Sequence, residues 1–320
     1  MPKVSRTGWK TDAGLLFAVL IWGVNFPILK AALSAMHPFV VNAFRFTVSA
    51  AVLGTVYAVR KRAGVGPSFG ETVRGFWKEL VGLGLLGYLF YQLSFITGID
   101  HTLASNAALI MASSPLWTAA FGHVFGLERI RRAAWLGLAV CLAGTAVVVI
   151  GGSHAVQFGS RTLLGNTLML LAAAMWGAYT AFSRPVLRRL QPSSVSFLAL
   201  MVALPFLYLL AVPYWGQVKW PQVDGWVWLA IIFSGGLSTG LTYVIWNSAV
   251  QAVGASQTAA FNNLVPFVGV LASFLILGED IYWPQIVGGA LIIGGLVITR
   301  GVREREEGGK RESVEEQVSG

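Results

Sequence analysis

The chain alternates between long apolar stretches and short polar segments. The apolar stretches are about 17 to 25 residues long, which is enough to cross roughly 30 Å of hydrocarbon as α-helices. Their residues are continuously apolar instead of alternating with a period of two, which excludes a membrane β-barrel. The sequence therefore predicts an all-α integral membrane protein with ten transmembrane helices: 13–33, 39–59, 80–99, 103–125, 133–151, 163–183, 195–215, 226–250, 255–277 and 283–299.

The second five stretches repeat features of the first five. A series in the first half recurs 151 positions later: Ala104-Ser105, Pro115, Glu128, Gly137 and Gly144 return as Ala255-Ser256, Pro266, Glu279, Gly288 and Gly295. Because each repeat holds an odd number of spans, the second repeat enters the bilayer from the opposite side. We expect two inverted five-helix repeats, 12–151 and 163–300, which would allow a secondary transporter to open alternately to either side. Residues 1–11 and 301–320 are then a cytoplasmic N-terminal segment and a disordered cytoplasmic tail.

Composition supports a membrane location, and charge predicts the orientation. With 55% hydrophobic and 12% charged residues, the chain has roughly half the charged fraction of a soluble globular protein. If the N-terminus is cytoplasmic, only Arg161 and Lys219 among the loop cations face outward, so the positive-inside rule places both termini in the cytoplasm. The net charge of +9 therefore reflects topology and not a nucleic-acid partner. We expect a multi-pass protein of a bacterial-type inner membrane.

Several short motifs carry a resemblance to a known family. They are Trp22-Gly23-Val24-Asn25-Phe26-Pro27 in the first span, Arg45-Phe46 in the second, and the repeated Ala-Ser, Pro, Glu and Gly series. Together they make residues 12–300 resemble an EamA-type member of the drug/metabolite transporter superfamily. The chain departs at Gly126-Leu127-Glu128, where the family usually carries the Leu-Gly-Glu found at 277–279, and at Asp100-His101, where members often carry an aromatic residue. The resemblance implies that spans one to four and six to nine surround a central cavity, with spans five and ten at the periphery.

Three prolines within the spans predict helix breaks beside that cavity. Pro27, Pro115 and Pro266 each lack a backbone N–H and leave the carbonyl four residues earlier without its helical partner. Those carbonyls belong to Gly23, Met111 and Asn262. In hydrocarbon such breaks are tolerated where protein or a water-filled cavity satisfies the backbone, and the alternative is that the prolines only bend their helices. The nearby amides are candidate substrate ligands: Asn25, Asn262 and Asn263.

Lys30 and Arg45 are cations inside predicted spans. A cation at the centre of a transmembrane helix costs roughly 2.5 to 3.5 kcal/mol, and less near an end where the side chain can reach the lipid headgroups. Both residues lie toward the predicted outer ends of their spans, so snorkelling to lipid phosphate is one explanation. The other is that one or both face the vestibule and bind a carboxylate or phosphate of the substrate. Lys30 has a counterpart in Arg184 of the second repeat, whereas Arg45 corresponds to Ala199.

The aromatic residues form two groups. Those near span ends fit a belt at the lipid–water interface: Trp77, Trp135, Trp215, Trp226 and Trp283. Those within spans expected to line the cavity are candidate substrate-binding residues: Trp22, Tyr91, Trp176, Tyr179, Tyr243 and Trp246. Buried Tyr and Trp need a partner for O–H or N–H, so they face protein or cavity more often than lipid, and helix packing alone is the alternative.

The acidic residues avoid the membrane centre. None of the fourteen Asp and Glu residues lies in the middle of a predicted span. The membrane-centre Glu with which small multidrug antiporters exchange protons for cationic drugs therefore has no equivalent. If transport is coupled to protons, the titratable candidates are His101 and His123, and the alternative is that both are structural.

The sequence shows no enzyme chemistry. It contains no HExxH motif, no Cys and His pattern for a metal and no phosphate-binding glycine loop, so we expect neither a cofactor nor a metal. We predict a secondary transporter that exports amino acids or related small amphipathic metabolites by alternating access. The alternatives are efflux of drugs or organic cations and, less favoured, a membrane-embedded enzyme. The repeated glycines would pack either within the monomer or across a homodimer: Gly137, Gly144, Gly288 and Gly295.

Overall fold

The computed structural model describes residues 6–64, 66–127, 136–137, 139–140, 143–144, 146–147, 161–295 and 297–298. Eight of the helices in these residues are long and apolar enough to cross a membrane: Trp9–Ala32, Pro38–Arg62, Phe69–His101, Ala104–Val124, Arg161–Leu187, Pro192–Trp215, Gly225–Val253 and Ala255–Leu277. A shorter apolar helix, Trp283–Gly295, follows them. The protein is thus an all-α membrane protein, as predicted. The predicted fifth span, 133–151, falls largely outside the described residues, and so does the predicted tail, 301–320.

The first half is built from α1 (Arg6–Ala32), α2 (Pro38–Arg62), α3 (Phe69–Gly84), α4 (Tyr91–His101), α5 (Ala104–Met111) and α6 (Ser114–Val124). A π-helical stretch, η1 (Leu85–Phe90), joins α3 to α4 in one continuous span. This span begins at Phe69, well before the predicted start at 80. A capping box fixes its first turn, because Ser68 Oγ accepts the N–H of Glu71 and the Glu71 carboxylate accepts the N–H of Ser68.

The second half contains α8 (Arg161–Leu187), α9 (Pro192–Trp215), α10 (Gly225–Ile232), α11 (Thr242–Val253), α12 (Ala255–Ala259) and α13 (Val265–Leu277). Three short stretches lie between these helices: the 3₁₀ turns η2 (Trp220–Gln222) and η4 (Ala260–Leu264), and the π-helical η3 (Phe233–Leu241) between α10 and α11. Asp224 starts α10 by accepting the N–H of Val227 at 3.0 Å. Each half therefore carries a π-helical stretch inside its third span, a feature often found at functional sites.

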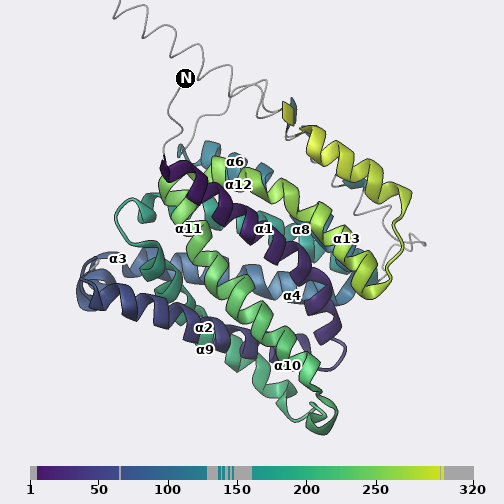
Figure 1. Cartoon of the computed structure of the whole chain (residues 1–320), viewed down its shortest axis with the longest axis horizontal. Helices are drawn as coiled ribbons and strands as arrows, with labels where there is room; N and C mark the ends of the chain where they lie inside the picture. Colours follow the sequence, from purple (N-terminus) through teal and green to yellow (C-terminus); the bar gives the residue numbers. More distant parts are fainter. Residues whose placement is uncertain are drawn as a thin grey trace, which may run out of the picture.

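Helices of the two halves pack against each other. α1 lies between α11 and α13, which both belong to the second half (Figure 1). α2 packs on α9, and α8 packs on both α4 and α6. The centre of the bundle is therefore bounded by helices from both halves.

Two glycines allow close contacts between the halves. A Cβ on Gly235 of η3 would stand 2.3 Å from the carbonyl oxygen of Arg45 on α2. A Cβ on Gly84 of α3 would stand 2.5 Å from the carbonyl oxygen of Ala199 on α9. Gly84 and Gly235 are 151 positions apart, and Arg45 corresponds to Ala199 in the sequence repeat. The two halves therefore use the same packing device at equivalent places.

Gly144 and Gly288 pack against each other within one chain. A Cβ on Gly144 would stand 2.6 Å from the carbonyl oxygen of Gly288 in the helix Trp283–Gly295. Small residues of this kind let two membrane helices approach closely. For these two glycines the contact agrees with the monomer alternative.

Pro115 and Pro266 stand where helices are interrupted. α5 ends at Met111, and α6 starts at Ser114 with Pro115 in its first turn. In the second half, α12 gives way to the 3₁₀ turn η4, after which α13 starts with Pro266 in its first turn. The first turn of a helix tolerates proline because its N–H groups have no intrahelical partner there.

Two predictions about the prolines are wrong. α1 continues through Pro27 without a break, because neighbouring helices can hold a membrane helix together when one hydrogen bond is missing. Pro266 does not leave the carbonyl of Asn262 unpaired, because that carbonyl accepts the N–H of Val265 in the 3₁₀ turn. The carbonyl group at this break in the ninth predicted span therefore has a hydrogen-bond partner in the backbone of the same span.

Candidate functional site

A cavity of about 50 Å³ lies at the centre of the bundle, among α1, α2, α4, α5, α8, η3, α11, η4 and α13. Seven residues predicted to bind substrate line it: Trp22, Asn25, Arg45, Tyr91, Trp176, Tyr243 and Asn262. Four others do not line it: Lys30, Tyr179, Trp246 and Asn263. A water molecule needs about 10 to 15 Å³ of such space. The cavity therefore has room for a few waters, and a larger substrate requires the helices to move apart.

Arg45 brings a positive charge to this cavity. Its side chain is 1% exposed, so it lies inside the bundle and does not snorkel to lipid. The guanidinium donates from Nε to Ser234 Oγ at 2.7 Å, from Nη1 to Asn42 Oδ1 at 3.0 Å and from Nη2 to Thr239 Oγ1 at 3.3 Å. These side chains of α2 and η3 position the guanidinium but carry no charge.

In the described part of the chain, the charge of Arg45 has no counter-charge nearby. Among the described residues, no carboxylate forms an ion pair with it. A buried charge is strongly unfavourable unless an opposite charge and hydrogen bonds compensate for it. The hydrogen bonds above use three of the five N–H donors of the guanidinium. Arg45 can therefore accommodate an anionic group of a substrate.

Trp176 is the centre of an aromatic cluster that forms one wall of the cavity. Five other aromatic rings lie 5.1 to 5.6 Å from its ring, measured between centroids: Trp22, Tyr91, Tyr179, Tyr243 and Trp246. The indole N–H of Trp22 donates to the carbonyl oxygen of Ser238 at 2.8 Å, so this ring is also held by η3. The wall is therefore assembled from both halves of the chain.

Tyr179 and Trp246 belong to this cluster but do not line the cavity. Trp246 Nε1 donates to Thr180 Oγ1 at 3.3 Å, and Asn247 Nδ2 donates to Tyr179 Oη at 2.9 Å. Both contacts join α8 to α11. The polar atoms of the two rings are thus used in contacts between helices, as the helix-packing alternative predicts. The prediction that Tyr179 and Trp246 line the cavity is wrong.

Three amides that line the cavity have an oxygen without a hydrogen-bond donor among the described residues: Asn25 Oδ1, Gln92 Oε1 and Asn262 Oδ1. Gln92 Nε2 donates to Tyr243 Oη at 3.0 Å. Asn262 Nδ2 donates to Ser114 Oγ at 3.0 Å. The nitrogens of Gln92 and Asn262 are thus engaged with the protein, while the oxygens are not.

Gln92, Ser238 and Thr239 line the cavity although none of them was predicted. For Gln92 a signal was available, because an amide in the middle of an apolar span is costly in lipid. Ser238 and Thr239 gave no such signal, since small hydroxyl residues bind the backbone of their own helix in many membrane proteins. Asn263 was predicted with its neighbour Asn262, but it does not line the cavity.

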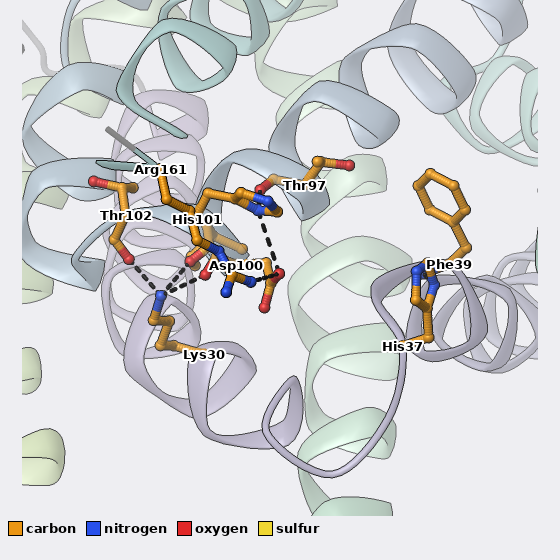
Figure 2. Close-up of polar contacts among 9 residues, drawn as sticks. Lys30, His37, Phe39, Thr97, Asp100, His101, Thr102 and Arg161 are labelled. Atoms are coloured by element: carbon orange, nitrogen blue, oxygen red, sulfur yellow. Dashed lines mark hydrogen bonds and ion pairs between the residues drawn. The ribbon is translucent and has the colours of Figure 1, made fainter. Parts of the chain in front are cut away.

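Lys30 lies away from the cavity, at the C-terminal end of α4 (Figure 2). Its Nζ donates to the carbonyl oxygens of Ile99 at 2.8 Å, Asp100 at 3.0 Å and Thr102 at 2.5 Å. An ammonium has three N–H donors, so all of them are used. A cation at this place also interacts favourably with the negative end of the helix dipole. Lys30 therefore caps a helix and does not snorkel to lipid, and a role of Lys30 in substrate binding stays a prediction.

Asp100 contacts two further side chains at this end of the bundle, which we call the Lys30 end. Its Oδ2 lies 3.1 Å from Arg161 Nη2 and 3.3 Å from His101 Nδ1 (Figure 2). The adjacent Thr102 bonds Asn166 of α8 through its hydroxyl. These contacts join α4 of the first half to α8 of the second half.

Glu279 joins the halves at the N-terminus of α5. Its Oε1 accepts the N–H of Ala104 at 2.8 Å, and its Oε2 accepts the N–H and the hydroxyl of Ser105 at 3.0 and 2.7 Å. A carboxylate at this place suits the positive end of the helix dipole. Two members of the repeated series, the Ala-Ser pair and the Glu, are therefore partners in the structure.

The two histidines predicted for proton coupling do not line the central cavity. His101 Nδ1 lies 3.0 Å from the carbonyl oxygen of Thr97 in its own helix. His123 lies in the last turn of α6. These positions favour a structural role, and proton coupling through either residue stays a prediction.

A larger hollow of about 1050 Å³ lies at the Lys30 end. Charged residues on its wall include Lys30, Asp100, Arg161, Lys219 and Asp224. His37 also lines it, and its ring stacks on Tyr214 with 3.5 Å between centroids and 5° between planes. Burial lowers the pKa of His37, and the negative charge of Asp100 partly offsets this effect.

The fold and the cavity define the class of this protein. In the described part of the chain, seven of the eight spans of membrane length line a cavity with aromatic walls, amide oxygens and a buried cation, which is typical of a small-molecule transporter. The chain belongs to the EamA-like transporter family, whose sequence profile matches residues 9–150 and 163–301. The family predicted from the sequence is confirmed.

Several curated relatives match along nearly their whole length. The chain is 26% identical over 288 residues to the uncharacterized transporter YyaM of Bacillus subtilis (strain 168), covering 90% of this chain and 92% of the relative. It is 27% identical over 313 residues to a probable terminal-alkyne amino-acid exporter of Streptantibioticus cattleyicolor, covering 97% and 98%. It is 26% identical over 294 residues to a probable amino-acid metabolite efflux pump of Salmonella typhimurium, covering 88% and 92%. The family and these relatives identify the chain as a transporter and not an enzyme.

One solved structure has a similar fold. A protein crystal structure with 21% sequence identity aligns with a TM-score of 0.68. The alignment covers 93% of this chain and 99% of that chain, so the similarity extends over both halves. At this identity the similarity concerns the fold alone.

Proposed function

We propose that the protein is a secondary transporter that exports amino acids or related small amphipathic metabolites by alternating access through the central cavity. The observation that carries this proposal is Arg45, a buried cation at the cavity without a carboxylate partner in the described part of the chain. A carboxylate on the substrate would supply the missing negative charge. This contact exists only while substrate is bound, which suits a site that must both bind and release.

The remaining cavity wall suits a substrate that also has an apolar part. Trp22, Tyr91 and Trp176 present aromatic surfaces to the same cavity as Arg45. Many amino acids combine a carboxylate with an apolar side chain and so meet both requirements. The names of two relatives also mention amino acids, one as a probable terminal-alkyne amino-acid exporter and one as a probable amino-acid metabolite efflux pump.

Alternating access would follow from ten transmembrane helices in two inverted repeats, 12–151 and 163–300. The equivalent glycine contacts and the equivalent π-helical stretches support this arrangement. A third correspondence involves the cations in the last turn of the first helix of each repeat. Lys30 binds the C-terminal end of α4, and a Cβ on Gly254, at the end of α11, would stand 3.1 Å from Arg184 Nη2. One cation of each repeat would then support the bundle at opposite membrane surfaces.

For the orientation, we place both termini in the cytoplasm and the Lys30 end outside, on the strength of the loop cations. Accessibility of single cysteines tests this in a Cys141→Ala background. Ser34→Cys should react with an impermeant reagent added from outside, and Ser68→Cys should not, since both residues are exposed but lie at opposite ends. The reverse labelling pattern would show the opposite orientation.

Transport by purified protein in liposomes tests the function. Uptake and counterflow would be measured for amino acids, nucleosides, organic anions and cationic dyes, with and without a pH gradient. We expect transport of at least one amino acid, and a loss of roughly tenfold to a hundredfold in affinity in Arg45→Gln. Arg188→Gln is the matched control, because Arg188 is exposed and away from the cavity.

Two outcomes would contradict the proposal. Competition by a cationic dye but by no amino acid would favour the drug-efflux alternative. Normal transport of carboxylate substrates by Arg45→Gln, at normal expression, would remove Arg45 from the binding site.

A further inference from the structure

Asn25, Gln92 and Asn262 bring amide groups to the central cavity from three different helical elements. Their side chains are 4%, 2% and 6% exposed. Each has an oxygen that receives no hydrogen bond from the described residues. A buried acceptor without a donor is unfavourable, and it is rare in folded proteins unless a function requires it. The cavity therefore favours a ligand that brings hydrogen-bond donors.

An ammonium group is the donor that fits these acceptors best. It carries a positive charge and three N–H donors, and three amide oxygens can accept from it. If one of the amides were instead a carboxylate, it could pair with Arg45 and neutralise the site from within. Amide oxygens attract a cation without forming that ion pair, so Arg45 stays available to an anionic group.

We infer that the cavity is bipolar: Arg45 binds the carboxylate of the substrate, and the oxygens of Asn25, Gln92 and Asn262 bind its ammonium group. This inference rests on the proposed function and narrows its substrates to zwitterions such as free α-amino acids. A cation without a carboxylate is repelled by Arg45. An acid without an amino group leaves the three acceptors unpaired, and sites built to hydrogen-bond a group strongly reject analogues that lack it.

The ammonium pole is assembled from both halves of the chain. Asn25 lies on α1 and Gln92 on α4, both in the first half, whereas Asn262 lies in η4 of the second half. A substrate bound to all three would therefore stabilise one arrangement of the halves over another, in proportion to its different affinity for each. The amino group would then contribute to conformational change as well as to recognition.

Competition among three matched compounds tests the inference in reconstituted protein. The probes are leucine, or whichever amino acid gives the strongest counterflow, with its N-acetyl derivative and its methyl ester. The N-acetyl compound keeps the carboxylate and loses the ammonium, and the ester does the opposite. In the wild-type protein we expect each derivative to compete at least about tenfold less well than the free amino acid.

Variants of neighbouring asparagines separate the two poles. In Asn262→Leu the preference for leucine over N-acetylleucine should fall toward equality, while the preference over the ester, which depends on Arg45, should persist. Asn263→Leu is the matched control, because Asn263 is adjacent and has a similar free oxygen but does not line the cavity. It should keep both preferences. An unchanged preference in Asn262→Leu would overturn the role of this amide.

Gln92→Glu tests which atom of the amide meets the substrate. Glutamate keeps the acceptor oxygens and loses the N–H donors, and the hydroxyl of Tyr243 can donate to it in place of accepting from Gln92. The new carboxylate can also pair with Arg45, which should weaken the binding of both carboxylate probes alike, so the measurement is the ratio between them. If the oxygens bind ammonium, the preference for the free amino acid over the N-acetyl compound should persist. Loss of that preference would show that the amide N–H meets the substrate and would overturn the inference.

The failure of this inference differs from the failure of the proposed function. Equal competition by leucine and N-acetylleucine, with both dependent on Arg45, would overturn the bipolar site and leave an acid exporter. No transport of any amino acid or derivative would reject the proposed function itself. If Asn262→Leu does not accumulate in the membrane, thermal unfolding of the wild-type protein in detergent replaces it. Leucine should then raise the melting temperature more than N-acetylleucine does. An equal rise with both compounds would overturn the inference.

Discussion

Lys30 and Arg45 are both cations inside apolar helices, but their partners differ. Lys30 gives its three N–H donors to backbone carbonyls at the end of α4. Arg45 gives three of its donors to uncharged side chains and forms no ion pair within the described residues. The comparison teaches that a charge in a membrane helix does not by itself mark a binding site. The informative feature is a charge whose partner is missing.

The hydrogen-bond acceptors at the Lys30 end and in the central cavity also differ in whether they have partners. At the Lys30 end, both carboxylate oxygens of Glu279 accept hydrogen bonds from the start of α5. In the central cavity, the oxygens of Asn25, Gln92 and Asn262 find no donor in the described structure. Variants at the Lys30 end should therefore change stability, whereas variants in the cavity should change substrate binding.

The largest effect is expected from Arg45→Leu, and it should be on transport. The kcat/KM for carboxylate substrates should fall roughly tenfold to a hundredfold, because a charge contact of about 1.5 to 3 kcal/mol is lost. The melting temperature in detergent should change little, because removing an uncompensated buried charge offsets the loss of its hydrogen bonds. Arg45→Lys keeps the charge but not the planar guanidinium group, so its kcat/KM should lie between those of the wild-type protein and Arg45→Leu. A much lower melting temperature with unchanged KM would make Arg45 a structural residue.

The residues of the cavity could be predicted better than those of the Lys30 end, and the reason is energetic. Mid-span polar and aromatic residues such as Arg45, Asn25 and Trp176 are costly or unsatisfied in lipid, so they must face protein or cavity. That cost is visible in the sequence. Which of them reach the cavity surface depends on helix rotation and depth, which packing decides. Trp246 shows this limit, because its N–H is used between helices.

The role of Lys30 could not be predicted, because its partners are backbone carbonyls 69 to 72 residues away. Every residue has such a carbonyl, so no sequence pattern marks these. The early start of α3 is a different case. Ser68 and Glu71 form a capping box that is readable in the sequence, and reliance on hydropathy alone placed the start of this span too late.

The next effect is expected from Glu279→Ala, and it should be on stability. Losing the hydrogen bonds to Ala104 and Ser105 should destabilise the protein by about 1 to 2 kcal/mol, the usual scale for an N-terminal cap. Thermal unfolding in detergent measures this. Asp280→Ala is the matched control, because Asp280 is the exposed neighbour. The ratio of leucine to N-acetylleucine competition should stay unchanged, and a changed ratio at normal stability would contradict the comparison.

A smaller effect is expected from Lys30→Met. It removes a cation from the C-terminus of α4, which should cost about 1 kcal/mol of stability. Acids and their esters should then be transported with the same relative KM as in the wild-type protein, because Lys30 does not line the cavity. Lys219→Met is the control, since Lys219 is exposed on the wall of the same hollow. A KM that rises for acids but not for esters would return Lys30 to the substrate path.

The smallest effect is expected from pH and His37, whose ring stacks on Tyr214 and joins the start of α2 to the end of α9. Burial lowers the pKa of His37, so the folded protein binds a proton here less readily than the unfolded chain does. As the pH falls through about 6.5, the unfolded state gains the proton first, and stability decreases until the pH passes the lowered pKa of the folded state. The melting temperature should therefore drop more between about pH 7.5 and 5.5 in the wild-type protein than in His37→Gln. Tyr214→Phe is the control, because it keeps the stacked rings and should keep the pH dependence of the wild-type protein. If His37→Gln shows the same pH dependence as the wild-type protein, other groups cause it.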